Sequence, residues 1–313
     1  MSATVGASFA EHDGTARART AATGLGPIGI VGAGRMGSSF ARNLFQDDFR
    51  VVVFDRDKSK AQAVAGTDAV ASDEWAALGE CEIVISMVPD DAAVRDVAER
   101  LSTVLVPGAV HVSMSTISPD AARDINQVHL KLGQRYVSAP VLGNPDLAAA
   151  RGLYVLAAGD AETVARCHPV LERLGQRVFV LGEQPELANT FKLAGNVLTA
   201  STMQSMGEVL AFLRKAGIDL ETAFSVLTES IFDGKVYKAY GGKIVKEHYS
   251  PPGMTVPLAV KDLRLALNHA ETLRVPMPVA SVVRDQLVAV SARGWDELDW
   301  SALGKLAAFS AGL

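Results

Sequence analysis

The sequence predicts an α/β domain with a parallel sheet, followed by an all-helical domain. The chain has 313 residues, more than the ~250 to 300 residues at which a single core usually stops growing. Short β-branched runs alternate with helical patterns from Ile28 to Val180, as in a parallel sheet with crossover helices. After Gly182 no convincing strand follows. We therefore predict an α/β domain at residues 27–184 and a helical domain at residues 185–313, joined by a long helix.

Residues 1–26 lie outside both predicted domains. They are rich in Ala, Thr, Gly and Ser, and they show no apolar periodicity before the first apolar run. Segments of this kind bury too little apolar surface to fold alone. We predict that residues 1–26 form a disordered extension.

The strands of the α/β domain are predicted at short runs of β-branched and aromatic residues. These runs are Ile28–Val31, Val51–Phe54, Ile83–Ser86, Val110–Ser113, Tyr136–Val137, Tyr154–Ala158 and Val178–Val180. Between the first two runs, Met36, Phe40, Leu44 and Phe45 recur at helical spacing, which is typical of a helix lying on a sheet. The domain therefore begins with a βαβ unit.

The helical domain begins with one long predicted helix, from about Pro185 to Lys215. Ala216-Gly217 is a terminating signal. Apolar residues recur along the helix at core-compatible spacing, at Leu187, Phe191, Ala194, Leu198, Val209 and Phe212. Shorter helices are predicted over Leu220–Ser230, Lys235–Lys246, Val256–Leu273, Pro278–Ala292 and Trp295–Phe309. A helix of ~45 Å is expected to be buried between domains or subunits.

Composition and charge argue against several classes of protein. The net charge is −5 and the basic residues are spread along the chain, so we expect no nucleic-acid partner. No run approaches the ~20 apolar residues of a membrane span, and the N-terminus lacks the apolar core of a secretory signal, so the cytoplasm is the expected compartment. Cys81 and Cys167 lack metal-ligand spacing. We expect both to be reduced and structural, and no metal to be bound.

A glycine-rich run follows the first predicted strand and opens the next helix. Its residues are Gly32, Ala33, Gly34, Arg35, Met36 and Gly37. Gly32 permits a tight turn, Gly34 leaves room for a pyrophosphate, and Gly37 lets the helix pack closely on the strand. The free N–H groups and dipole of the helix N-terminus stabilise phosphate charge. In this strand–turn–helix context the run predicts a Rossmann-type dinucleotide site.

Two neighbouring residues point to different dinucleotides. Asp55 ends the second strand, 23 residues after Gly32, where a carboxylate accepts hydrogen bonds from the adenosine ribose of NAD(H). Arg56 follows, with Lys58 and Lys60 close behind, and is placed to pair with the 2′-phosphate of NADP(H). Because Arg56 has no evident structural task, we lean slightly to NADP(H).

Two further loops follow predicted parallel strands, at the sheet edge where ligands of open α/β sheets bind. Met87, Val88 and Pro89 follow the third strand, and we expect them against the dinucleotide. Ser115 and Thr116 follow the fourth, and we expect them near the nicotinamide or the substrate. The alternative is that these residues only cap helices and pack the loops.

Several separated motifs together resemble the β-hydroxyacid dehydrogenase family, which includes 3-hydroxyisobutyrate dehydrogenases, tartronate semialdehyde reductases and glyoxylate/succinic semialdehyde reductases. The run Gly32–Gly37 is similar to the family's cofactor fingerprint, and Ser115–Pro119 to its Ser-Thr-Ile-x-Pro segment. Lys192 and Asn196 match its Lys-x-x-x-Asn signature, and Lys261–Leu263 its Lys-Asp-Leu motif. The resemblance covers nearly the whole chain after the extension.

The resemblance implies hydride transfer between a nicotinamide and a β-hydroxy acid or semialdehyde. Lys192 is then the catalytic acid/base, Asn196 helps to hold the substrate, Lys261 contacts the cofactor and Asp262 the substrate. Chemistry agrees, because a carbonyl that accepts a hydride needs a proton donor beside it. Burial lowers the pKa of a lysine toward neutrality, which suits that task. Lys192 and Asn196 are also four residues apart, on one helical face.

Two substrate positions depart from the family's usual pattern. Ser138–Asn144 has the sequence Ser-Ala-Pro-Val-Leu-Gly-Asn, where small-hydroxy-acid enzymes usually have Asp-Ala-Pro-Val-Ser-Gly-Gly. Leu142 removes a hydroxyl donor and adds bulk, while N–H groups around Gly143, next to Asn144, stay available to a carboxylate. Met254 stands where the family often has phenylalanine and is more adaptable. These changes favour a larger or less polar substrate.

Two other functions fit parts of the sequence. Imine reductases resemble this family in fold, and the altered Ser138–Asn144 segment is compatible with C=N substrates, although they usually replace the lysine. A non-catalytic dinucleotide-binding module would be expected to lose Lys192 or its helical partner, and both are present. In each case we expect a small-molecule ligand. The long helix and the apolar C-terminal helices favour a homodimer or homotetramer.

Overall fold

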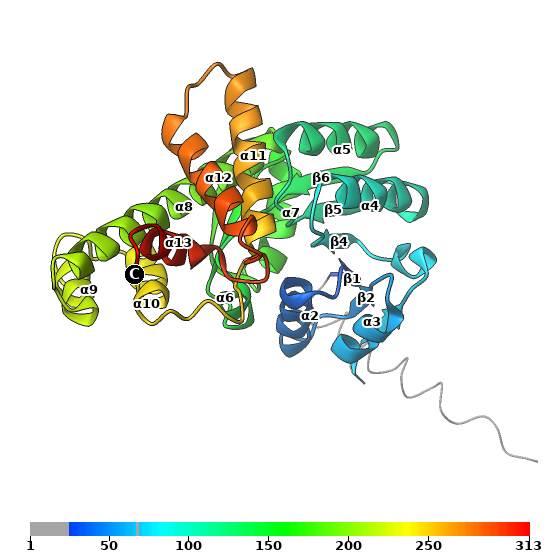
Figure 1. Cartoon of the computed structure of the whole chain (residues 1–313). Coiled ribbons are helices and arrows are strands. Elements are labelled where there is room, and N and C mark those ends of the chain that lie inside the picture. Colours follow the sequence, from blue (N-terminus) through cyan, green and yellow to red (C-terminus); the bar gives the residue numbers. More distant parts are fainter. Residues whose placement is uncertain (1–24, 67–68) are drawn as a thin grey trace, which may run out of the picture. The chain divides into compact units, whose positions relative to one another are not determined.

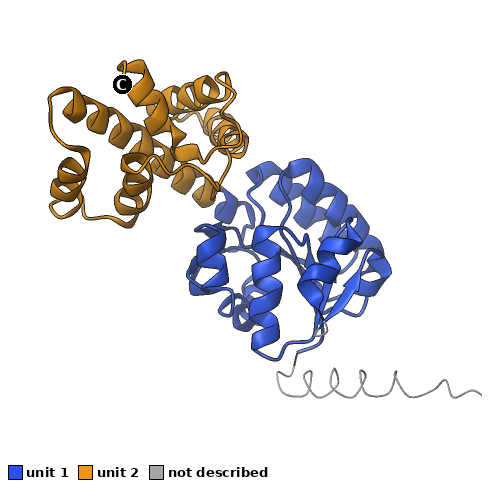
Figure 2. Ribbon diagram, turned by 60° about the horizontal axis from the view of Figure 1, so that its bottom comes forward, with its two compact units in different colours: residues 1–189 blue, residues 190–313 orange. Residues whose placement is uncertain are grey.

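The computed structural model describes residues 25–66 and 69–313. The chain divides into two compact units, the first ending at Asn189 and the second covering Thr190–Leu313. Figure 2 colours the first unit blue and the second orange. The division falls inside the long helix, a few residues after the predicted boundary at 184/185. Nearly all of the predicted extension, residues 1–24, lies outside the described residues.

The first unit is built on a six-stranded parallel sheet of order β3-β2-β1-β4-β5-β6 (Figure 1). Its strands are β1 (Ile28–Val31), β2 (Val51–Phe54), β3 (Val70–Ser72), β4 (Ile83–Ser86), β5 (Val110–Ser113) and β6 (Arg135–Ser138). The α/β prediction is confirmed, with five of these strands in the predicted places. The exception is β3, an edge strand of three residues, none of which is buried.

Side chains alternate along the strands and point into two layers of helices. On one face, Ile30, Val53 and Ile85 pack with Phe40 and Leu44 of α2. The helices that contribute to this face are α2 (Arg35–Gln46), α3 (Lys58–Ala65), α6 (Pro145–Ala149) and α7 (Ala161–Leu171). These helices form one of the two layers that cover the sheet.

On the opposite face, Val31 and Val84 pack with Val97 and Leu101 of α4. The elements that contribute to this face are η1 (Trp75–Leu78), α4 (Asp91–Val104) and α5 (Pro119–Lys131). Strands buried on both faces explain the nearly continuous apolar runs in the sequence.

The last predicted strands of the α/β domain form a second sheet, which corrects the expectation of a single parallel sheet. Its order is β7-β8-β9, with β7 (Val141–Leu142), β8 (Leu153–Ala157) and β9 (Gly175–Val180). β7 runs antiparallel to β8. Pro140, just after β6, has no N–H with which to extend a ladder, and its carbonyl accepts from Leu156 N of β8 at 2.9 Å.

The helical unit contains the larger part of α8 (Glu186–Lys215) and five further α-helices. These are α9 (Leu220–Thr228), α10 (Lys235–Val245), α11 (Val256–Thr272), α12 (Pro278–Ser291) and α13 (Leu303–Ser310). The helix predicted from Trp295 is wrong at its start, because only the 3₁₀ turn η2 (Trp300–Ala302) precedes α13. Asp299 caps that turn, accepting from Ser301 N at 3.1 Å.

The prediction of which face of α8 is buried is also wrong within the chain. Its buried positions include Leu193, Val197, Ala200, Met203 and Leu210. The predicted core positions Leu187, Phe191, Leu198, Val209 and Phe212 are instead exposed, as is Ala194. Both faces of this helix are apolar, so periodicity alone does not say which one meets the core of the same chain.

Membrane-spanning helices, metal-binding clusters and the state of the two cysteines were also addressed by the sequence. Among the described residues, no helix is both long and apolar enough to cross a membrane, and no group of three or more His, Cys, Asp or Glu side chains is arranged to hold a metal ion. Cys81 and Cys167 are buried free thiols. Burial raises the pKa of each to about 12, so neither is a reactive thiolate at neutral pH.

Candidate active site

The glycine-rich run forms the turn between β1 and α2. Gly32 has φ +98°, and a Cβ there would overlap the carbonyl oxygen of Met87. A Cβ on Gly37 would overlap the carbonyl oxygen of Gly32. Around Gly34 the same position has no heavy atom within 4 Å. Gly32 and Gly37 therefore build the turn, whereas Gly34 leaves open space beside it.

The helix that follows this turn begins without a side-chain cap. α2 starts at Arg35, and its N-cap residue, Gly34, has no side chain with which to bind the first N–H groups. Such a helix N-terminus, with open space next to it, fits the pyrophosphate of a dinucleotide. Ala33 lies in the same turn, and Met36 is the second residue of α2.

Asp55 is bound to the backbone of this turn. Its Oδ2 accepts from Ala33 N at 2.8 Å, and its Oδ1 accepts from Asp57 N at 2.9 Å. Each oxygen keeps a second lone pair, so a ribose hydroxyl still fits. Arg56 is exposed, and within residues 25–66 and 69–313 its side chain makes no hydrogen bond or ion pair.

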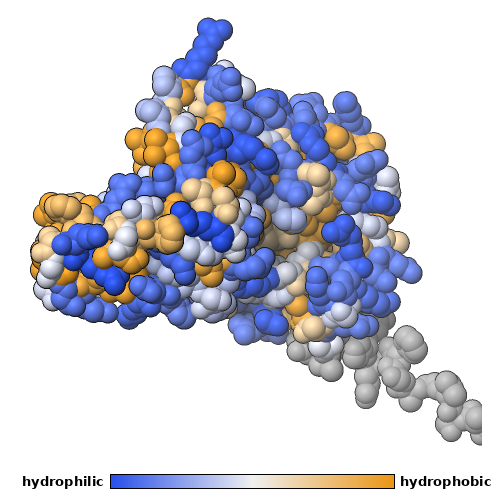
Figure 3. Space-filling view, in the orientation of Figure 1, coloured by the Kyte–Doolittle hydropathy of each residue, from blue (hydrophilic) through white to orange (hydrophobic). Residues whose placement is uncertain are grey.

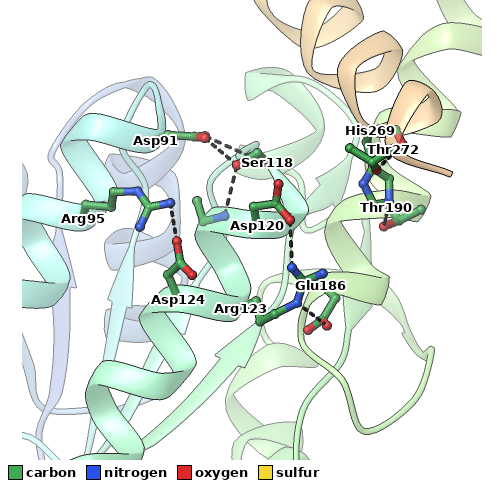
Figure 4. Close-up of polar contacts among 11 residues, drawn as sticks. Asp91, Arg95, Ser118, Asp120, Arg123, Asp124, Glu186, Thr190, His269 and Thr272 are labelled. Atoms are coloured by element: carbon green, nitrogen blue, oxygen red, sulfur yellow. Dashed lines mark hydrogen bonds and ion pairs between the residues drawn. The ribbon is translucent and has the colours of Figure 1, made fainter.

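The loops after β4 and β5 are tied together at the same sheet edge. Val88 N donates to Ser115 Oγ at 2.9 Å, and Ser115 is fully buried. Ser115 therefore positions the Met87–Pro89 loop through the backbone, and Thr116 is the next residue along. A second tie joins the N-termini of α4 and α5, since Ser118 Oγ donates to Asp91 Oδ2 at 2.5 Å (Figure 4).

The Leu142–Asn144 segment has a structural role of its own. Leu142 belongs to β7 and packs against the cluster of Leu156, Ala158 and Ala188. Asn144 caps the short helix α6 (Pro145–Ala149), accepting from Leu147 N at 2.9 Å. Gly143 has φ +142°, a backbone conformation that favours glycine.

In the helical unit, Lys192, Asn196 and Asp262 form a buried polar chain. Lys192 Nζ donates to Asn196 Oδ1 at 2.9 Å, and Asn196 Nδ2 donates to Asp262 Oδ2 at 2.6 Å. Lys261 Nζ lies 3.1 Å from Asp262 Oδ1. Lys192, Asn196 and Asp262 are each less than 7% exposed. Four residues expected at the site from two separate helices, α8 and α11, are thus brought together.

This environment changes the acidity of Lys192. Burial lowers its pKa from 10.5 to about 8. The neighbouring carboxylate of Asp262 opposes that change, while the second cation, Lys261, adds to it. An amine with a pKa near neutrality exchanges protons readily in either direction at working pH. The group is therefore suited to act as a general acid and a general base.

Met254 takes part in the packing of the helical unit. Its carbonyl accepts from Trp300 N at 3.0 Å, and its side chain is partly buried against the helical core. It lies two residues before α11, the helix that carries Lys261 and Asp262.

Asn189 is a buried polar residue that sequence reasoning missed. It is fully buried in the first turn of α8, and neither its Oδ1 nor its Nδ2 has a hydrogen-bond partner among the described residues. The available signal was its spacing, because it precedes Lys192 by three residues and so lies on the same helical face.

Comparisons with known proteins agree with this architecture. Residues 27–182 match the NAD binding domain of 6-phosphogluconate dehydrogenase, and residues 187–307 match the NAD-binding domain of NADP-dependent 3-hydroxyisobutyrate dehydrogenase. Glyoxylate/succinic semialdehyde reductase 1 of Arabidopsis thaliana is 30% identical over 287 residues, covering 90% of this chain and 99% of that protein.

Solved structures of related proteins also resemble this chain over most of its length. A 3-hydroxyisobutyrate dehydrogenase from Salmonella typhimurium superposes with a TM-score of 0.81 at 26% identity, covering 90% of this chain and 99% of that one. An imine reductase from Pseudomonas sp. shares the fold, with a TM-score of 0.61 at 22% identity over 90% of this chain and 99% of that one.

The parallel sheet, its glycine turn and the helical unit define an NAD(P)-dependent oxidoreductase of the Rossmann class. Within that class, the chain belongs to the 3-hydroxyisobutyrate dehydrogenase, or β-hydroxyacid dehydrogenase, family. The resemblance inferred from the sequence motifs is confirmed.

Proposed function

We propose that the enzyme transfers a hydride reversibly between a nicotinamide and a β-hydroxy acid or related semialdehyde, with Lys192 as the general acid/base. The observation that carries the proposal is the buried Lys192, bonded to Asn196 and with a pKa lowered to about 8. The bound nicotinamide supplies or accepts the hydride. Lys192 Nζ gives a proton to the carbonyl oxygen in reduction and takes it from the hydroxyl in oxidation.

The neighbours of Lys192 orient its amine. Asn196 Nδ2 donates to Asp262 Oδ2, which turns the carboxamide so that Oδ1 accepts from the lysine. One N–H of the ammonium is therefore used within the helical unit, and the other two are available to a substrate oxygen. Asn196 and Asp262 position the proton donor in this proposal, and Asn196 also contacts the substrate.

The substitution Lys192→Met tests the assignment. We expect kcat for carbonyl reduction to fall by about 10²- to 10⁴-fold, the usual contribution of a general acid, with cofactor affinity retained. Lys215→Met, at the exposed C-terminus of the same helix, is the matched control and should keep full activity. Equal activity in wild type and Lys192→Met would remove the assignment. No turnover by wild type on a broad substrate panel would favour a non-catalytic dinucleotide-binding module.

The substrate proposal follows from Leu142. An apolar side chain stands where a hydroxyl donor is usual in relatives that act on small hydroxy acids, so a larger or less polar acid or semialdehyde fits better. The same change, together with the imine reductase likeness in fold, supports reduction of C=N substrates as the second candidate. Rates on hydroxy acids, semialdehydes and a cyclic imine, measured side by side, separate the two.

For the cofactor we propose a preference for NADP(H). Arg56 is exposed, and in the described part of the chain its side chain makes no hydrogen bond or ion pair. An unpaired guanidinium beside the adenosine position suits a 2′-phosphate. Arg56→Ala should raise KM for NADPH at least about 10-fold, which corresponds to a loss of about 1.4 kcal/mol of binding free energy. KM for NADH should remain unchanged. Arg42→Ala, an exposed arginine of α2, is the control.

We further propose that the helical unit pairs with a second copy of the chain. Phe191, Leu198 and Phe212 are spaced by multiples of seven along α8 and are between 50% and 71% exposed. Val209 and Leu187 add to this exposed face. Figure 3 shows hydrophobic residues at the surface of the α8–α9 end of the helical unit. Apolar helix faces of this kind are commonly covered in homo-oligomers.

A further inference from the structure

Asn189 presents an unusual polar group, because a fully buried carboxamide has both its donor and its acceptor unpaired. The side chain is 0% exposed, and no hydrogen bond to Oδ1 or Nδ2 is formed by the described residues. Burying a polar group without hydrogen bonds opposes folding, so proteins seldom retain one without a reason. One reason is that a bound ligand completes the hydrogen bonds.

The first turn of α8 is held at the carboxyl edge of the parallel sheet. Arg123 of α5 lies with its Nε 3.1 Å from Glu186 Oε1 and its Nη1 2.8 Å from Asp120 Oδ1 (Figure 4). Asp120 lies in the first turn of α5, the helix that follows β5. Glu186, and with it the turn that contains Asn189, is therefore anchored where β5 ends.

A second contact places this turn beside the end of β6. Ala188 is fully buried in a cluster with Leu156 and Ala158. Ala158 pairs with Ser138, the last residue of β6. Asn189 directly follows Ala188, so it lies at the edge where β5 and β6 end.

That edge is the nicotinamide half of the dinucleotide site. In a sheet of order β3-β2-β1-β4-β5-β6, the dinucleotide lies across the carboxyl ends of the strands, with its pyrophosphate at the turn after β1. Asp55 and Arg56 mark the adenosine half, since they follow β2. The other half of the molecule, with the nicotinamide, therefore lies over β4, β5 and β6.

We propose that Asn189 binds the carboxamide of the nicotinamide ring, an inference that rests on the NAD(P) dependence of the enzyme. The unpaired atoms of Asn189 are one acceptor and one amide donor, and a primary carboxamide offers the complementary donor and acceptor in one plane. A carboxylate offers acceptors only and leaves Oδ1 unpaired. Lys192 follows Asn189 by three residues on the same face of α8.

The test is a binding experiment on the whole chain that combines one substitution with one change in the cofactor. The 3-acetylpyridine analogue of the preferred dinucleotide keeps the carbonyl acceptor but has a methyl group in place of the amide donor. Dissociation constants for the natural oxidised cofactor and for this analogue are measured by titration calorimetry, for wild type and for Asn189→Leu. Wild type should bind the natural cofactor about 10-fold more tightly, the range of one buried hydrogen-bond pair, and Asn189→Leu should bind both alike.

Controls separate this binding role from a structural one. Without cofactor, Asn189→Leu should have a Tm equal to or above that of wild type, because the substitution removes an unpaired buried amide. Gln204→Met replaces another buried amide of α8 that has an unpaired oxygen, 15 residues further along, and should keep the wild-type discrimination.

Two outcomes would overturn the inference about Asn189, and a third would refute the proposed function on which it rests. Unchanged discrimination in Asn189→Leu excludes Asn189 as the carboxamide receptor, whatever its Tm. Loss of discrimination in Gln204→Met as well would show that the effect is not specific to Asn189. Wild type that binds neither NADP⁺ nor NAD⁺ would instead refute the proposed function itself.

Discussion

At the scale of single residues, Lys192 determines how the rate should depend on pH. Its pKa is lowered to about 8 by burial, so the ammonium predominates below pH 8 and the free amine above it. Reduction needs the ammonium as acid, and oxidation needs the amine as base. We therefore expect kcat/KM for reduction to be level at low pH and to fall above about pH 8, and kcat/KM for oxidation to rise through the same pH. Parallel pH profiles in the two directions would contradict this mechanism.

The neighbours of Lys192 should move that pH dependence in opposite directions. The Asp262 carboxylate raises the pKa of Lys192, and Lys261 lowers it. Asp262→Asn keeps the shape of the side chain but removes its charge, so the limb near pH 8 should move to lower pH. Lys261→Met should move this limb to higher pH. The same substitution is also expected to raise KM for the cofactor, because Lys261 is assigned a cofactor contact. Profiles of kcat measured with saturating cofactor test both, and shifts in the same direction would exclude an electrostatic cause.

How much of the site is visible in the sequence differs from residue to residue. The Lys192–Asn196 pair is predictable because helical spacing alone brings side chains four residues apart together. The pairing of Asn196 with Asp262, 66 residues later, depends on how α8 packs against α11. Asn189 is missed because an asparagine in a helix carries no sign of its burial, and Asn144 is expected at the substrate although it caps α6.

At the scale of structural elements, different glycines of the turn after β1 serve cofactor binding and folding. A Cβ on Gly34 meets no atom within 4 Å, whereas one on Gly37 would overlap the carbonyl oxygen of Gly32. Gly34→Val should therefore retain the Tm of wild type and weaken cofactor binding by 10-fold or more, since it fills the space left for the pyrophosphate. Gly37→Ala should lower the Tm by several degrees, because α2 must move away from β1. Thermal unfolding and cofactor titration of both variants test this, and equal Tm losses would contradict it.

A buried chain of hydrogen bonds connects β4, β5 and α5 on the face of the six-stranded sheet that α4 and α5 cover. Ser86 Oγ lies 2.8 Å from His111 Nε2, His111 Nδ1 lies 2.9 Å from His129 Nε2, and His129 Nδ1 lies 2.8 Å from Gln134 Oε1. Gln134 Nε2 donates to the carbonyl oxygen of Leu105 at 2.7 Å, which makes Oε1 the acceptor. Burial lowers the pKa of both imidazoles, and when both are neutral each one donates from Nδ1 and accepts at Nε2.

This chain predicts a loss of stability in acid. Burial lowers the pKa of both His111 and His129, so the folded protein binds fewer protons than the unfolded chain. The stability they confer is complete above the ordinary pKa of 6.5 and is lost as the pH falls below it, by up to about 1.4 kcal/mol per histidine and pH unit. Urea unfolding at pH 7.5 and 5.5 should show this dependence in wild type. It should be weaker in His111→Leu and unchanged in His248→Leu, an exposed histidine; an unchanged dependence in His111→Leu would contradict it.

The sequence predicts the central elements better than the marginal ones for a physical reason. Strands buried on both faces have nearly continuous β-branched runs, so β1, β2, β4 and β5 are found with their exact limits. β3 and β7 contain three and two residues, too few for a periodic pattern. That β8 and β9 form a second sheet depends on the antiparallel pairing of β7 with β8 just after Pro140, which periodicity does not encode.

At the scale of the whole molecule, the apolar pattern of α8 shows why a single chain is an incomplete context. A helix with two apolar faces satisfies the periodicity of a core on either side. One of them packs inside the helical unit through Leu193, Val197 and Leu210. The other, which sequence reasoning assigned to the core, is exposed in the chain by itself, as would be expected if another copy covers it.

The oligomer can therefore be tested on the exposed face of α8. Leu198 and Phe212, both 71% exposed, are about 21 Å apart at 1.5 Å per residue, so an interface along the helix buries both. Leu198→Glu and Phe212→Glu should each convert an oligomer into monomers at micromolar concentration, because a buried unpaired carboxylate destabilises an apolar interface strongly. Light scattering after size exclusion gives the mass directly. Val279→Glu is the matched control, since this valine of α12 is 63% exposed but lies on another helix. If wild type is already a monomer, the proposed pairing is wrong, and if only Val279→Glu dissociates, the interface lies on α12 instead.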